Sequence, residues 1–153
     1  MCVKGIFFLC GLAALAVLQV SGIYVYTPGD VMAINGMDIR LKCTFQTASK
    51  IYHDSVSISW RFRPLEPGRE EEEVFYYQQK AYSPQEGMFR NRTLWAGDIM
   101  GKDASIIIRE VNFAFNGTYT CRVKNPPDVH GWVGEIRLRV VNPGPETPPD
   151  HDN

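Results

Sequence analysis

The sequence has little of what enzymes and nucleic-acid-binding proteins require. Histidine occurs only 3 times and cysteine 4 times, with no Cys-X-X-Cys pair and no spacing typical of zinc ligands. No glycine-rich loop precedes a helix, so a phosphate-binding loop is not expected. The 16 basic and 17 acidic side chains nearly cancel, which argues against a nucleic-acid partner. We therefore expect no metal, no cofactor, no small-molecule substrate and no catalysis.

Long hydrophobic runs are also absent, apart from one at the N-terminus. Lys4 precedes an apolar run over residues 6–20, which is shorter than the roughly 20 residues needed to span a bilayer. Slim residues around Gly22 complete the pattern of a secretory signal peptide over residues 1–22. A retained signal anchor is the alternative. On the first interpretation the mature chain begins near Ile23 in the secretory pathway and, as it stands, is soluble.

Cysteine is scarce in the expected mature chain. Cys2 and Cys10 fall within the signal peptide, which leaves Cys43 and Cys121. In an oxidising compartment two cysteines imply one disulfide with a single possible connectivity. Closing so long a loop stabilises a fold by roughly 4–5 kcal/mol in the chain-entropy model. The alternative of two free thiols finds no metal-ligand partners, so we favour a structural disulfide.

Helical periodicity is missing as well, and short strands separated by turn signals take its place. Asn-Gly, Pro-Gly and Pro-Pro pairs separate the strands. The strands are indicated by alternating, β-branched or aromatic runs at residues 39–43, 56–63, 74–79, 105–108, 119–123 and 136–140. This pattern predicts one all-β domain over residues 23–141. The proline-rich segment 142–153 cannot form a core and is predicted to be a linker or stalk.

Four residues in the strand pattern narrow the fold further. Cys43, Trp60 and Cys121 follow one another on alternating strands, and Tyr119 lies two residues before the second cysteine. In an immunoglobulin sandwich these are the inter-sheet disulfide, the tryptophan that packs on it, and the tyrosine corner. Enough strands lie between Trp60 and Cys121 for the variable type. We therefore expect a V-type immunoglobulin β-sandwich of two antiparallel sheets in a Greek key.

Several segments resemble the myelin protein zero family over residues 23–141. They include Ile23–Thr27, Leu41–Phe45, Asn116–Cys121 and Val123–Asp128, the last of which is more specific than the general immunoglobulin features. The resemblance implies homophilic cell–cell adhesion by a single V-type ectodomain, followed by one transmembrane helix in a type I cell-surface protein. The implied partner is a second copy on an apposed cell, or a related immunoglobulin-type adhesion protein. The alternative is a regulatory ectodomain like those of channel-associated β-subunits, which would bind a different protein.

One residue departs from the pattern of the family. An Asp usually stands where this chain has Phe115, and in the family it pairs with an Arg at the start of strand D. The matching arginine here is Arg92. This ion pair cannot form, so the packing of that corner is left open by the sequence.

Two sequons for N-glycosylation occur in the expected mature chain. They begin at Asn91 and Asn116, and each has Thr two positions later and no proline between. Asn116 precedes a strand, where the family resemblance also implies a glycan. The alternative for Asn116 is a turn-forming Asn-Gly pair without a sugar.

The sheet that contains Trp60 is expected to offer the binding surface. Ser57, Ser59, Arg61 and Arg63 alternate with its buried residues. On the next strand either Phe75 and Tyr77 or Val74 and Tyr76 face outward, and we choose Phe75 and Tyr77. Trp132 lies in the loop before the last strand, at the end away from the stalk. Arginine and aromatic residues are enriched at binding hot spots, although the aromatic residues could instead cover the edge of the core.

Overall fold

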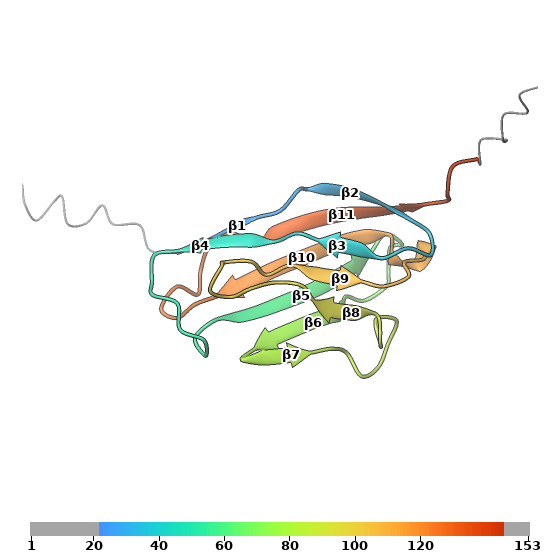
Figure 1. The fold of residues 1–153 in the computed structure, drawn as a ribbon. Helices are drawn as coiled ribbons and strands as arrows, with labels where there is room; N and C mark the ends of the chain where they lie inside the picture. The colour runs from blue at the N-terminus through green and yellow to red at the C-terminus, as the bar shows by residue number, and fades with distance from the viewer. Residues whose placement is uncertain (1–21, 146–153) are drawn as a thin grey trace, which may run out of the picture.

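Two layers of β-strands form the domain in the computed structural model, which describes residues 22–145 (Figure 1). Most of the expected signal peptide and of the expected stalk therefore lies outside the described residues. One layer is a six-stranded sheet in the order β2 (Asp30–Ile34), β11 (Gly134–Val141), β10 (Gly117–Lys124), β5 (Ser57–Pro64), β6 (Glu72–Gln78) and β7 (Lys80–Tyr82). The other layer contains β3 (Ile39–Leu41), β9 (Ile106–Ile108), β8 (Thr93–Trp95) and the pair β1 (Ile23–Tyr26) and β4 (Thr44–Thr47). The predicted all-β sandwich is confirmed, and its Greek-key description stays a prediction.

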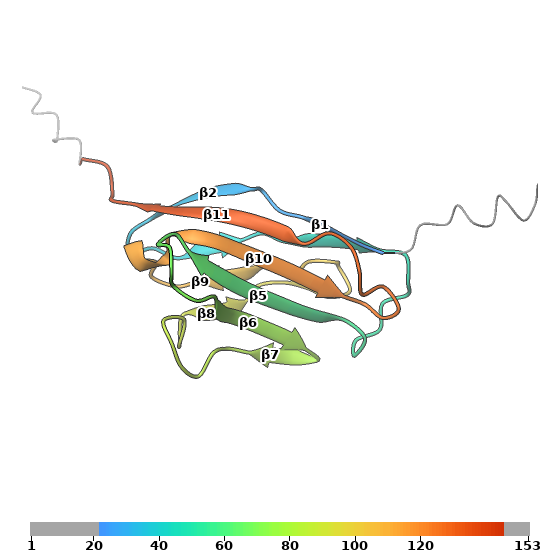
Figure 2. The ribbon, with the colours of Figure 1, turned by 180° about the vertical axis from the view of Figure 1, so that it is seen from behind.

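The prediction of purely antiparallel sheets is wrong at one edge. β2 pairs with β11 in parallel, from Arg137 opposite Asp30 to Val141 opposite Ile34. The reason is that β1 pairs with β4 in one layer, and the next strand lies in the other layer. Between them the chain turns at Gly29, which has φ +85°. The carbonyl of Gly29 accepts a hydrogen bond of 2.6 Å from the amide of Arg137 and so fixes the crossing. Figure 2 shows β2 beside β11 at the edge of the sheet.

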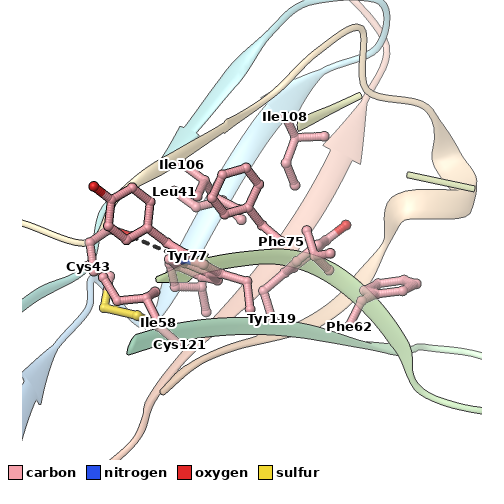
Figure 3. Close-up of a cluster of buried hydrophobic side chains, with 14 of the residues drawn as sticks. Leu41, Cys43, Ile58, Phe62, Phe75, Tyr77, Ile106, Ile108, Tyr119 and Cys121 are labelled. Carbon is pink, nitrogen blue, oxygen red and sulfur yellow. Dashed lines mark hydrogen bonds between the residues drawn. A yellow bond between two sulfur atoms is a disulfide. The ribbon is translucent and has the colours of Figure 1, made fainter. Parts of the chain in front are cut away.

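A disulfide and a tryptophan join the two layers. Cys43, between β3 and β4, is bonded to Cys121 of β10, as Figure 3 shows within the buried cluster. Trp60 is fully buried on β5, and its indole nitrogen donates a 2.9 Å hydrogen bond to the carbonyl of Ala104 in the facing layer. Buried polar groups are stable only when they are hydrogen-bonded. These contacts fix which side of β5 and β10 faces the core.

A β-bulge changes the outward residues of β6. Trp60 lies opposite Phe75 and Arg61 lies opposite Glu73, so Val74 is an extra residue in the ladder. A bulge of this kind turns two consecutive side chains to one face, and both Val74 and Phe75 are buried. Tyr77 is buried as well. The prediction that Phe75 and Tyr77 face outward is therefore wrong, because they lie opposite the buried Trp60 and Ile58 and so share their inward face.

An aromatic stack fills the corner before β10, which the sequence left open. Phe115 ends the short 3₁₀ helix η1 (Phe113–Phe115) and stacks on Phe89 with ring centroids 5.0 Å apart. The Arg92 guanidinium lies 5.8 Å from the centre of the Phe115 ring and donates a 2.8 Å hydrogen bond to the carbonyl of Glu110. The Tyr119 hydroxyl donates to the Phe115 carbonyl at 2.7 Å. The corner is packed without a buried carboxylate.

We predict that Phe115→Ala lowers the free energy of unfolding by about 3–5 kcal/mol, because the truncation leaves a cavity beneath the aromatic stack. Phe113→Ala in the same helical turn is the matched control, since Phe113 is 49% exposed. Its expected change is within about 0.5 kcal/mol. Urea unfolding followed by tryptophan fluorescence measures both. Equal losses in the two variants would contradict the role given to the stack.

Candidate binding surface

The outer face of the six-stranded sheet carries a shallow depression over β5 and β10. Its floor is made of the short side chains of Ser59 and Thr120. They are diagonal neighbours on adjacent strands, since Thr120 pairs with Arg61, two residues after Ser59. Longer side chains form the rim, and the depression has a volume of about 220 Å³. The rim residues are Arg61, Arg63, Glu71, Arg122, Val133 and Glu135. The arrangement is a concave, polar surface with arginines around it.

The arginines of this face differ in their partners. Arg61 lies 3.4 Å from the carboxylate of Glu71, and both side chains are about half exposed. Arg137 forms two hydrogen bonds with Asp30, at 2.8 and 2.9 Å. Those hydrogen bonds, and the charge of Asp30, raise the pKa of Arg137. Within residues 22–145, Arg63 and Arg122 have no ion pair in the structure, so both cations are available to a partner.

Tyrosines, together with a lysine, border the depression on the side of β6 and β7. Tyr76 is half-buried on β6 and faces Tyr82 of β7, with ring centroids 6.0 Å apart. The ammonium group of Lys80 lies 5.3 Å from the centre of the Tyr82 ring. Tyr76 and Tyr82 therefore form the exposed aromatic surface that the sequence analysis assigned to Phe75 and Tyr77.

Trp132 lies in the loop between β10 and β11 and is 72% exposed. Its amide donates a 3.1 Å hydrogen bond to the carbonyl of Ile23, which holds the loop against the first strand. Val133, the next residue, belongs to the rim of the depression. The loop lies at the end of the domain opposite to the last residues of β11 (Figure 2). The structure thus places an exposed indole at the end of the domain predicted for it.

A buried polar cluster fixes the base of this loop. The carboxylate of Asp128 accepts hydrogen bonds from the Thr47 hydroxyl at 2.6 Å and the Ser49 amide at 3.0 Å. Asn125 accepts from the Ser55 hydroxyl at 2.8 Å. These bonds tie the β10–β11 loop to the β4–β5 loop. The hydrogen bond from Thr47 is the main reason why the pKa of Asp128 is lowered, against the opposing effect of burial.

The two sequon asparagines occupy different surroundings. Asn91 is exposed and adopts φ +57°, two residues before β8. Asn116 is half-buried, and its carboxamide oxygen accepts a 2.7 Å hydrogen bond from the Val140 amide. Its nitrogen donates at 2.8 Å to the Phe113 carbonyl. A sugar on that nitrogen leaves one of the two amide protons, so this contact is compatible with glycosylation.

Among the residues of the surface that the sequence analysis did not choose, three are informative: Thr120, Arg122 and Tyr76. Thr120 and Arg122 alternate with the buried Tyr119, Cys121 and Val123, so the period-two pattern already carried the signal. Tyr76 belonged to the alternative that the sequence analysis did not choose, because alternation alone does not say which of the two sets on this strand faces Trp60. Within residues 22–145 no helix has the length and hydrophobicity to cross a membrane. In the same residues no three potential metal ligands come together.

Comparisons with known proteins agree with the geometry. A model of the immunoglobulin V-set domain matches residues 26–141. Myelin protein zero-like protein 2 of Bos taurus is 43% identical over 138 residues, and that of Mus musculus is 44% identical over 137. Each alignment covers 90% of this chain but 63% of the relative, so the chain spans less than two thirds of their length. Human myelin protein P0 is 35% identical over 134 residues, which cover 87% of this chain and 53% of that protein.

We predict that the Asp128 cluster stabilises the domain in a pH-dependent way. Because the folded-state pKa lies below the ordinary value of 3.8, the stabilisation is present above that pH. It is lost as the pH falls through the folded-state pKa. Asp128→Asn should lower the free energy of unfolding by roughly 1–3 kcal/mol at neutral pH, and this difference should shrink in acid. Asp54→Asn, at an exposed carboxylate of the β4–β5 loop, is the control and should match wild type in urea titrations at each pH.

Proposed function

Because the chain belongs to the immunoglobulin V-set family, we propose that it mediates homophilic cell–cell adhesion through a single V-type ectodomain. The proposal extends to the secretory signal peptide of residues 1–22 and the stalk of residues 142–153. It also extends to a membrane anchor that would hold the domain at the cell surface. The similarity to myelin protein zero-like proteins supports this assignment, which concerns binding and not catalysis.

The observation that carries the proposal is the outer face around the depression. Arg61, Arg63 and Arg122 surround a floor of small polar side chains, and Tyr76 and Tyr82 border it. Arginine and tyrosine are over-represented where protein interfaces gain most of their free energy. A face used only for solvation needs neither aromatic rings nor a concave shape. We therefore assign self-recognition to this face together with Trp132.

Weak binding suits this role. Proteins held in a membrane meet their partners in large numbers, and many low-affinity contacts then add to a strong and reversible attachment. The exposed ion pairs of the face contribute little individually, since surface pairs are typically worth about 0–1 kcal/mol. A single pair of domains in solution is therefore expected to associate only at high concentration.

We also propose glycans at Asn116 and Asn91. Asn116 immediately precedes β10, on the side of the domain where β11 ends. Its carbonyl accepts a 3.2 Å hydrogen bond from the Leu65 amide. A glycan there would shield that end of the domain. The loop that carries Trp132 lies at the opposite end of β10 and remains accessible. Asn91 precedes β8 in the facing layer, so both modifications are compatible with the assigned binding surface.

The self-association prediction is tested by sedimentation equilibrium of the glycosylated domain, residues 23–141, from micromolar to near-millimolar concentration. We expect reversible self-association that Trp132→Ala weakens by about tenfold or more, because the indole supplies a large buried contact area. Leu94→Ala is the control, since Leu94 is exposed on the other layer. Melting temperatures should be unchanged in both variants. A strict monomer at every concentration would reject homophilic binding and favour a heterophilic partner, such as a channel subunit.

The glycan prediction is tested by secretion from animal cells and mass measurement before and after enzymatic deglycosylation. Thr118→Ala removes the sequon of Asn116 without touching the asparagine, and we expect the loss of one glycan. Thr118→Ser keeps the sequon and should keep the glycan. Asn91→Gln should remove a second glycan. If the masses of the Thr118→Ala and Thr118→Ser proteins differ only by the one extra oxygen atom of serine, Asn116 is unmodified.

A further inference from the structure

A second hollow, the Asn116 groove, lies on the outer face of the six-stranded sheet at the end where β11 finishes (Figure 2). It has a volume of about 390 Å³. Among residues 22–145 none lines both this groove and the depression over β5 and β10, so the two hollows are separate. Besides Asn116, the side chains that shape the groove are those of Leu65, Thr118, Arg137, Arg139 and Val140.

The groove has one apolar wall and one cationic wall, and Asn116 lies between them. The ladders of β10 with β5 and with β11, continued by one residue, place Asn116 between Leu65 and Arg139. The Leu65 side chain is 77% exposed, which is unusual for a leucine fixed beside a central strand. Arg139 is also exposed, and within residues 22–145 it has no ion pair. Both walls are therefore open to a ligand.

The carboxamide of Asn116 is held in one orientation. Its oxygen accepts a 2.7 Å hydrogen bond from the Val140 amide, so it points toward β11. Its nitrogen donates at 2.8 Å to the Phe113 carbonyl. The same carbonyl accepts a 3.2 Å hydrogen bond from the backbone amide of Asn116, so it lies beside the main chain. The side-chain contact therefore uses the proton on the Cβ side of the nitrogen.

This orientation determines where a sugar on Asn116 begins. Attachment of a sugar turns the carboxamide into a secondary amide, and such amides prefer the trans arrangement. In that arrangement the first carbon of the sugar replaces the proton beside the carboxamide oxygen, and the proton on the Cβ side remains. The hydrogen bond to Phe113 is then kept. The sugar starts on the side of Asn116 that faces Val140, which is inside the groove.

We propose that the first N-acetylglucosamine of the Asn116 glycan docks in this groove, an inference that rests on the glycan proposed above. A pyranose ring in the groove lies between Leu65 and Arg139. The C–H groups of the ring then cover Leu65, and burial of apolar surface is favourable. The guanidinium of Arg139 carries only donors, which suit the hydroxyl and acetamide oxygens of the sugar. The glycan is thus part of the folded surface and accounts for the exposed leucine.

Thermal unfolding tests the docking in an Asn91→Gln background, which leaves the sequon of Asn116. The chain is secreted from animal cells that make only high-mannose glycans, and an endoglycosidase then leaves a single N-acetylglucosamine. The reference is the same chain from the bacterial periplasm, which forms disulfides but does not attach this sugar. We expect the single sugar to raise the melting temperature by about 3–6 °C, because the contact with the groove exists only in the folded state.

Two variants locate the source of this rise. Leu65→Ser/Arg139→Ser removes both walls of the groove and should abolish most of the rise. Leu94→Ser/Arg109→Ser makes the same substitutions at exposed positions outside the groove and should keep it. Each rise is measured against the unglycosylated form of the same variant, so the direct effects of the substitutions cancel.

The contact itself is measured by nuclear Overhauser effects between protons of the sugar and methyl groups of the protein. Cross-peaks to Leu65 and none to Leu94 are expected. If mass measurement finds the glycan on Asn116 and either the rise or the cross-peaks are missing, the docking is wrong while the proposed glycan stands. If Asn116 carries no glycan, both are wrong.

Self-association separates the docked sugar from a second copy of the domain as the occupant of the groove. The unglycosylated Leu65→Ser/Arg139→Ser chain should self-associate as the unglycosylated parent does. If it associates more weakly and the sugar-dependent rise in melting temperature is unchanged, the groove belongs to an interface between copies and the docking is wrong.

Discussion

The tie between the two layers at Cys43, Cys121 and Trp60 is the constraint on which the rest of the structure depends. It fixes β10 and β5 to the facing layer, and a strand whose one face is fixed inward has its other face determined. A shift of β5 by one residue would move Arg61 into the core. The same shift of β10 would move Arg122 into the core and expose Tyr119. The chemistry of the outer surface is therefore a consequence of how the interior is joined.

The sequence predicts this part of the fold well because the signals are local and repeated. Alternation marks β5, β10 and β11, and it identifies Arg61 and Arg63 as outward residues. At β6 it leaves two choices of outward residues, and only the pairing of Phe75 with Trp60 and of Tyr77 with Ile58 decides between them. It fails at β2, whose parallel partner lies about a hundred residues away in the chain. The family pattern, in turn, left the Phe115 corner open, because the packing of Phe115 on Phe89 is a property of three-dimensional contacts.

The outer face and the loop end of the domain have different structural supports. The face lies on the central strands of the sheet, so Arg61, Tyr76 and Arg122 keep fixed spacings. The Trp132 loop has two isolated β-bridges, Asn125 with Asp128 and Gly131 with Ile23, and the buried carboxylate of Asp128 and amide of Asn125 support it further. A surface on rigid strands suits recognition by register, and the loop is held both at its base and against Ile23 by the backbone hydrogen bonds of His130 and Trp132.

The parallel pairing of β2 with β11 has a mechanical consequence. β11 is hydrogen-bonded on both sides, to β10 and to β2, and it is the strand from which the chain continues beyond Val141. Tension applied there runs along the strand, so the hydrogen bonds on both sides are loaded together in shear. They cannot open one after another, as the bonds of a hairpin pulled apart from its ends would. A domain with this arrangement resists being pulled open by a force applied to the chain beyond Val141.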